Sequence, residues 1–154
     1  MFELGSFAHL LEIFDQVTRA IADAVNRARG QKRRMLLELQ SNIELIYSYG
    51  RYDLPIDEVI LGLETDAMRD ALESGYRFQA LQRAEVSHET AGKEPQYQQY
   101  VGWSTEQLFS NIYVKVKDLR RIVQMDPSNK QIRKRVRLIN VLKMMALVVK
   151  HVHA

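Results

Sequence analysis

The sequence of 154 residues contains no cysteine. This absence excludes a disulfide framework, a thiolate metal site and a cysteine nucleophile. Glycine occurs seven times and proline three times, so sharp turns are few and the elements of secondary structure are expected to be long. Hydrophobic residues make up 46% of the chain and charged residues 27%, a balance typical of a globular protein and not of a disordered tail. We therefore predict a single folded domain over residues 1–154.

Long apolar runs are also missing. A membrane-spanning helix needs about 18 or more apolar residues in succession, whereas the longest apolar stretch, residues 144–149, lies between Lys143 and Lys150. The first residues carry no basic cluster, and Glu12 and Asp15 interrupt the apolar positions there, so we expect no secretory signal peptide. We expect a cytoplasmic protein without a membrane partner.

Apolar residues recur every three or four positions along the first fifty residues, which is the spacing of one face of an amphipathic helix. One stripe ends at Val25 and the next begins at Leu36, and this separation equals three helical turns. The residues after Gly30 are good helix formers and include no N-cap residue. We therefore predict one long helix over residues 6–50, bent at Gly30, where glycine costs about 1 kcal/mol relative to alanine. The alternative is a hairpin that turns at residues 29–32.

Three further helices are predicted, over residues 55–83, 104–125 and 127–154. Gly62 allows a break in the first of these, with Thr65 as the new N-cap. Between the helices, residues 85–103 read as one long loop that contains a polar and aromatic run.

No alternating strand pattern competes with these helices. We predict an all-α fold, an antiparallel bundle of four long helices. A break near Gly30 in the first of these helices is the alternative.

The last predicted helix changes its character along its length. Its first half has cations on one side and apolar residues on the other, but beyond Leu138 apolar residues surround the helix. A helix that is apolar on every side is either central in a bundle or covered by another chain. Because helices of a small bundle normally keep a solvent face, we predict a subunit or partner interface here; a central position is the alternative. The predicted interface residues are Val141, Met144, Met145 and Val148.

Charge is distributed unevenly along the chain. Residues 51–110 contain five Lys and Arg against eleven Asp and Glu, whereas residues 111–154 contain eleven Lys and Arg against two Asp and Glu. Seven cations flank a predicted turn at residues 126–129: Lys117, Arg120, Arg121, Lys130, Arg133, Lys134 and Arg137. Such a basic turn would neutralise phosphates of RNA or DNA in a salt-dependent and largely sequence-independent way. An acidic protein partner and a solvated surface are the alternatives.

Motifs for catalysis are largely missing. The sequence contains no Gly-rich phosphate loop, no serine-nucleophile elbow, no His-Glu-x-x-His and no dinucleotide fingerprint, and we expect neither a cofactor nor a metal. The segment Arg83-Ala-Glu-Val-Ser-His88 is similar to the Arg-x4-His spacing of helical HEPN-type ribonucleases. The similarity covers six residues, and Ala84 stands where those nucleases tend to place a polar residue. It implies a ribonuclease site formed by Arg83 and His88.

These observations favour a non-catalytic helical interaction or assembly module, which forms a homo-oligomer or docks with a protein partner in a larger complex. The alternative is a nucleic-acid-binding accessory subunit that uses the basic turn. The third hypothesis is a helical ribonuclease of the HEPN type.

Overall fold

The computed structural model describes the backbone of residues 2–125 and 131–154, and the side chains of residues 14–125 and 133–154. Its longest helices are α1 (Phe2–Arg27), α2 (Gly30–Tyr52), α7 (Thr105–Met125) and α8 (Gln131–His153). The shorter elements between them are α3 (Ile56–Gly62), α4 (Asp66–Ser74), the 3-10 helix η1 (Phe78–Ala80), α5 (His88–Ala91) and α6 (Pro95–Gln98). No strand occurs in the described residues, and the predicted all-α fold is confirmed.

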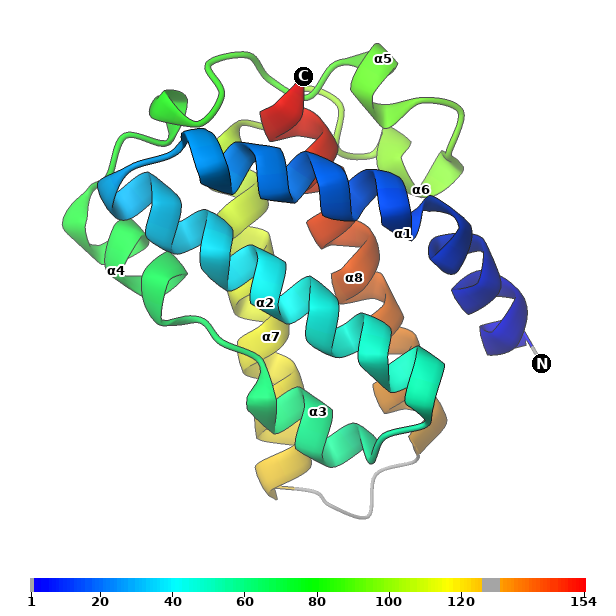
Figure 1. Cartoon of the computed structure of the whole chain (residues 1–154). Coiled ribbons are helices and arrows are strands. Elements are labelled where there is room, and N and C mark those ends of the chain that lie inside the picture. Colours follow the sequence, from blue (N-terminus) through cyan, green and yellow to red (C-terminus); the bar gives the residue numbers. More distant parts are fainter. Residues whose placement is uncertain (1, 126–130) are drawn as a thin grey trace.

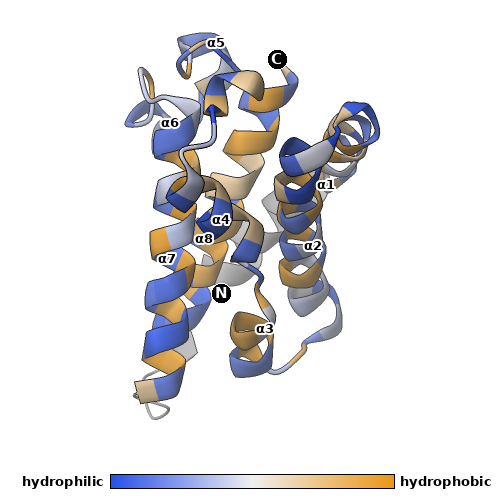
Figure 2. Cartoon of the chain, turned by 90° about the vertical axis from the view of Figure 1, so that its left-hand side faces the viewer, coloured by the Kyte–Doolittle hydropathy of each residue, from blue (hydrophilic) through white to orange (hydrophobic). Residues whose placement is uncertain are grey.

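The long helices form two hairpins that lie in two layers (Figure 1). Helices α1 and α2 form one layer, and α7 and α8 form the other, which is seen from the side in Figure 2. Helix α1 packs on α8, and α2 also contacts α8, so the layers meet along α8. The hairpins cross one another, and the prediction of four aligned antiparallel helices is therefore not confirmed. No helix in the described part of the chain is long and apolar enough to cross a membrane.

The predicted single helix over residues 6–50 is wrong, because the chain turns between α1 and α2. Gly30 has a φ of +59°, in the left-handed region that glycine adopts at little cost. Arginine side chains satisfy carbonyl groups at the end of α1: Arg33 donates to the Val25 carbonyl at 2.8 Å and Arg29 to the Ala28 carbonyl at 2.9 Å. The spacing of the two apolar stripes fits the hairpin equally well, because both stripes face the same core.

The predicted helix over residues 55–83 is interrupted at Gly62, where the sequence allowed a break. Helix α4 then ends at Gly75, which has a φ of +71°. Residues 85–103, predicted as one loop, contain the single-turn helices α5 and α6. Backbone hydrogen bonds join the ends of this segment: the Val86 N–H donates to the Trp103 carbonyl, and the Gly102 N–H donates to the Val86 carbonyl.

Helix α8 is the centre of the core, and this corrects the predicted protein interface. The four interface candidates are each at most 2% exposed within the single chain: Val141, Met144, Met145 and Val148. Helices α1, α2 and α7 cover α8 together with the short α3 and α5. The helix keeps a solvent face, but polar residues such as Arg137 and Asn140 occupy it. The predicted interface residues lie on the sides of α8 that the other helices cover.

Candidate functional site

The seven cations predicted to form one basic turn are not equivalent in the structure. Lys130 and the predicted turn at residues 126–129 lie outside the described residues. Lys134 is buried, with its side chain 1% exposed, and its Nζ lies 2.9 Å from the Asp57 carboxylate of α3. This ammonium group is therefore paired within the fold, and its expected availability to a partner is wrong.

The remaining five cations lie along α7 and α8. Lys117 lies over the ring of Tyr113, with Nζ 5.4 Å from the ring centroid, and Arg120 is half-buried. The other three side chains are exposed: Arg121, Arg133 and Arg137. Only some of the predicted cations are thus free to meet a partner.

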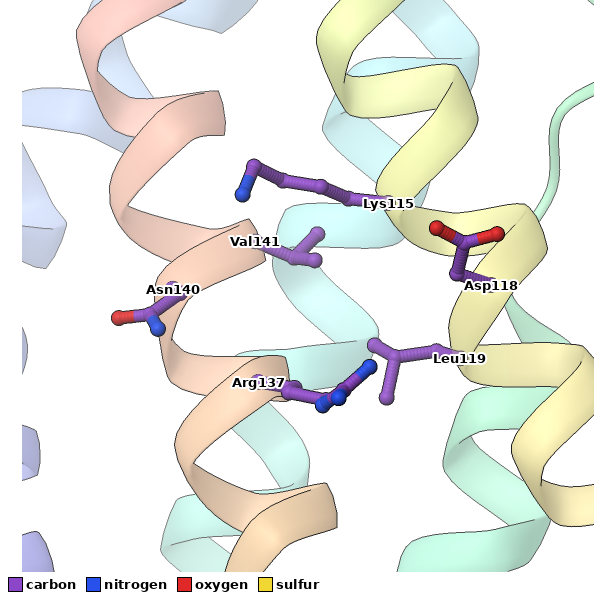
Figure 3. Close-up of a pocket in the computed structure, with 6 residues that line it drawn as sticks. All are labelled: Lys115, Asp118, Leu119, Arg137, Asn140 and Val141. Atoms are coloured by element: carbon purple, nitrogen blue, oxygen red, sulfur yellow. The ribbon is translucent and has the colours of Figure 1, made fainter.

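A groove runs between α7 and α8, on the side that faces away from the α1–α2 layer. Its first hollow has a volume of about 290 Å³ and is lined by Lys115, Asp118, Leu119, Arg137, Asn140 and Val141. Figure 3 shows Lys115 of α7 and Arg137 of α8 reaching across the space between the helices, with α2 behind them. Leu119 and Val141 are buried and form an apolar floor beneath these charges.

A second hollow continues the groove toward α6. It has a volume of about 230 Å³ and shares Lys115 and Asn140 with the first. Its other lining residues are Gln96, Tyr97, Gln99, Tyr100, Lys143 and Met144. The two hollows together are called the α7–α8 groove below.

The aromatic residues of the second hollow are fixed by contacts within the fold. The hydroxyl of Tyr97 donates to the Lys143 carbonyl at 2.9 Å. Burial raises the pKa of Tyr97 above its ordinary value, so this hydroxyl stays protonated and remains a donor. Tyr100 is half-buried and meets Trp103 edge to face, with ring centroids 4.9 Å apart. The polar and aromatic run at residues 96–100 thus lies against the basic hairpin.

The charged side chains of the groove have no partner in the described part of the chain. Three are cations, Lys115, Arg137 and Lys143, and one is a carboxylate, Asp118; none of the four side chains makes a hydrogen bond or ion pair with a described residue. Of the three cations, only Arg137 was predicted as a site residue. No pattern in the sequence marked Lys115, because it meets Arg137 only through the packing of α7 on α8. Lys143 joins the site only because the α6 segment packs beside α8.

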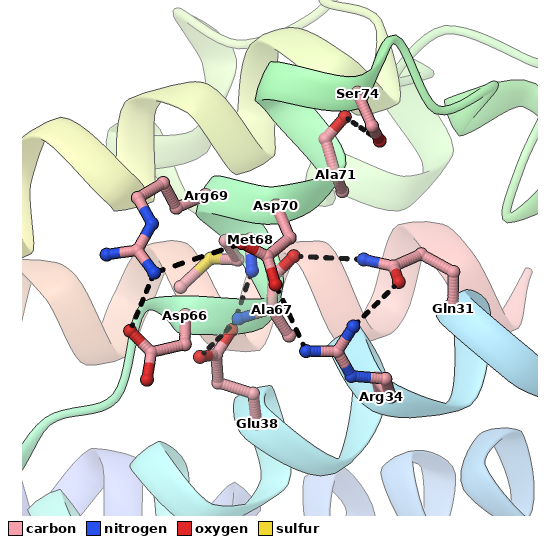
Figure 4. Close-up of polar contacts among 10 residues, drawn as sticks. All are labelled: Gln31, Arg34, Glu38, Asp66, Ala67, Met68, Arg69, Asp70, Ala71 and Ser74. Carbon is pink, nitrogen blue, oxygen red and sulfur yellow. Dashed lines mark hydrogen bonds and ion pairs between the residues drawn. The ribbon is translucent and has the colours of Figure 1, made fainter.

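A second concentration of polar side chains lies between α2 and residues 64–70 (Figure 4); it is called the α2–α4 seam. Glu38 is 5% exposed and accepts hydrogen bonds from the backbone N–H groups of Ala67 at 2.9 Å and Met68 at 2.8 Å. These bonds satisfy two donors at the start of α4. Burial raises the pKa of Glu38, although both hydrogen bonds favour its ionised form.

The other members of the seam are also paired. The amide of Asn42 donates to the Glu64 carbonyl at 2.8 Å and accepts from the Glu64 N–H at 2.7 Å. Arg34 forms an ion pair with Asp70 at 3.2 Å. Because partners for these groups come from within the chain, the seam fastens α4 to α2.

A third polar cluster joins the end of α8 to the start of α7. The Thr105 hydroxyl donates its one hydrogen to the Gln82 carbonyl at 2.8 Å. Its contact of 2.9 Å with Nε2 of His151 is therefore a hydrogen bond that Nε2 donates. Burial lowers the pKa of His151, which keeps the ring neutral. Among the described residues, no group of three or more His, Asp and Glu side chains is placed to hold a metal ion.

The two residues of the ribonuclease hypothesis are both exposed. Arg83 lies in a stretch without helix, and His88 begins α5. Neither residue lines the α7–α8 groove, so this hypothesis gains no support from the geometry.

Comparison of the chain with models of known protein families, with curated proteins and with solved structures found no significant match. The cytoplasmic location and the identity of any partner stay predictions.

Proposed function

We propose that this protein is a non-catalytic binding module that docks on an anionic macromolecule through the α7–α8 groove. The observation that supports the proposal is the set of cations in the groove, Lys115, Arg137 and Lys143, which have no partner among the described residues. Lys134, in the same helix as Arg137, is instead paired with Asp57. Self-association through Val141, Met144, Met145 and Val148 is not proposed, because these side chains are buried.

Electrostatics favours a polyanion as the partner. Three cations along one groove can each neutralise one anionic group and release its condensed counterions. Such binding weakens as salt rises, and for a single-stranded polyanion the slope of log affinity against log salt is roughly −0.7 for each neutralised phosphate. Three contacts then predict a loss of roughly 20-fold between 50 and 200 mM salt.

The test is a titration of the protein with fluorescein-labelled inorganic polyphosphate and with labelled RNA and DNA oligonucleotides, followed by anisotropy. We expect Lys115→Glu and Arg137→Glu each to weaken binding by about tenfold or more, because each change replaces an attraction by a repulsion. Arg19→Glu is the matched control, since Arg19 is an exposed cation of α1 in the other layer. Binding that is absent at 50 mM salt, or that all three variants weaken equally, would overturn the proposal.

A further inference from the structure

We infer that the anionic partner is a single-stranded nucleic acid, and that the hollow between α6, α7 and α8 accepts one unpaired base. This inference rests on the proposed function of the groove. It deepens that proposal because the two hollows differ in chemistry while they share Lys115 and Asn140. A chain of alternating charged and aromatic groups matches this arrangement, and a nucleic acid is such a chain.

The first hollow suits a phosphate group. Lys115 and Arg137 reach across it from opposite helices (Figure 3). Arginine presents a planar fork of donors to phosphate oxygens, and lysine adds a compact charge. Asp118 lies at the edge of this hollow on α7, and its carboxylate disfavours a second anion beside it.

The second hollow suits a base. Its side-chain amides belong to Gln96, Gln99 and Asn140. Gln96 donates to the Glu94 carboxylate at 2.7 Å and Gln99 to the Gln96 carbonyl at 3.2 Å. Each of these two amides keeps a second N–H and its carbonyl oxygen, a donor and an acceptor that match a base edge. The ring of Tyr100 offers a stacking surface, and Trp103 packs against it edge to face at 4.9 Å. The volume of about 230 Å³ lies below the range of drug-sized pockets and fits a single small ring system.

The recessed position of these groups favours a single strand over a duplex. Paired bases expose their edges in grooves that a protruding helix or strand must enter. Here the amides and Tyr100 line a hollow between helices, so a base can reach them only when it is out of the stack. A run of Asp and Glu residues would satisfy the cations but has no ring to fill the amide-lined hollow.

The experiment compares four labelled ligands at 50 mM salt: a mixed-sequence single-stranded 20-mer, the duplex of the same sequence, inorganic polyphosphate of similar charge, and poly-glutamate. We expect the single strand to bind at least tenfold more tightly than each of the others, because only it offers unstacked bases. The emission of Trp103, the one tryptophan of the chain, should change with the single strand and not with polyphosphate.

Two variants separate the base from the phosphate. Gln99→Ala and Tyr100→Ala change residues that line the second hollow and not the first. Each should weaken single-strand binding by about five- to tenfold and leave polyphosphate binding unchanged. Arg137→Glu should weaken both. Tyr100 packs on Trp103, so Tyr100→Ala is checked for folding by circular dichroism. Gln99 is exposed, and its side chain donates to the nearby Gln96 carbonyl at 3.2 Å. Gln99→Ala is therefore expected to fold, which keeps the test valid if Tyr100→Ala does not.

The outcomes distinguish the inference from the proposed function. Equal affinity for polyphosphate and the single strand, with no effect of Gln99→Ala, overturns the base hollow and leaves the anion-binding groove standing. Tighter binding of the duplex or of poly-glutamate also overturns the inference and retains the groove. A failure of all four ligands to bind overturns both.

Discussion

The α2–α4 seam and the α7–α8 groove both gather polar side chains between helices, but they differ in where the partners of those side chains lie. In the seam, Glu38 and Asn42 meet backbone groups of the segment before and within α4 at 2.7–2.9 Å. In the groove, Lys115 and Arg137 meet no described partner. Burying an unpaired polar group is costly, and in the seam Glu38 and Asn42 are both paired where they are covered. Polar groups left unpaired in an open recess are the ones available to a ligand.

The largest expected effect comes from removing the central acceptor of the seam. Glu38→Ala leaves the buried N–H groups of Ala67 and Met68 without acceptors, and we expect the free energy of unfolding to fall by about 2–3 kcal/mol. Urea denaturation followed by circular dichroism measures this change. Glu38→Gln, which keeps one acceptor oxygen, should lose less than the alanine variant. A loss below about 0.5 kcal/mol for Glu38→Ala would show that the seam is not what holds α4 in place.

A smaller, pH-dependent effect should come from the paired cluster at His151. Its pKa in the folded protein lies below the ordinary value of 6.5, so between these two values only the unfolded chain takes up the proton. The free energy of unfolding should therefore decrease as pH falls through this window, with a slope of at most about 1.4 kcal/mol per pH unit. Urea denaturation at a series of pH values from 7.5 to 5.5 measures the slope.

His151→Gln is the control for that slope, because it removes the titrating ring and keeps an amide donor for Thr105. The raised pKa of Glu38 acts in the opposite direction, since its protonation favours the folded state as pH falls toward the acid range. Subtracting the profile of the His151→Gln variant isolates the histidine. An unchanged slope in this variant would assign the effect to another group.

The smallest effect on stability is expected in the groove. Lys115→Met and Arg137→Met remove charges that have no described partner, so we expect the free energy of unfolding to change by less than about 0.5 kcal/mol. The same variants should lose polyanion affinity. Thermal unfolding and anisotropy titration on one preparation provide both readouts. A loss of stability as large as that of Glu38→Ala would show that the groove side chains, like those of the seam, stabilise the fold.

Local patterns in the sequence predicted the helical class and the approximate extent of α7, because periodicity and capping depend on near neighbours. They offered the turn near Gly30 only as the alternative to one continuous helix. Both a continuous helix and a hairpin place the stripes that end at Val25 and begin at Leu36 on the core, and only a long-range choice separates them. The positive φ of Gly30 marks the turn, and the spacing of apolar residues does not predict this backbone conformation.

The site was less accessible to sequence reasoning than the fold. Lys134 and Arg137 lie one turn apart and read as one basic face, yet Asp57 of α3 pairs with the first and not with the second. Helix α3 is distant from α8 in sequence, so no local pattern shows that Lys134 is paired and Arg137 is not. The same holds for the second hollow of the groove, where the hydrogen bond from Tyr97 to the Lys143 carbonyl joins the α6 segment to α8.

The central position of α8 also has a consequence for how the chain folds during synthesis. Helix α1 emerges from the ribosome early, but its apolar residues Val17, Ile21 and Val25 belong to a core that α8 completes. Contacts between segments so far apart in sequence form late, and proteins that depend on such contacts fold slowly. The apolar residues of α1 and α2 that pack on α8 therefore stay exposed until α8 has been made.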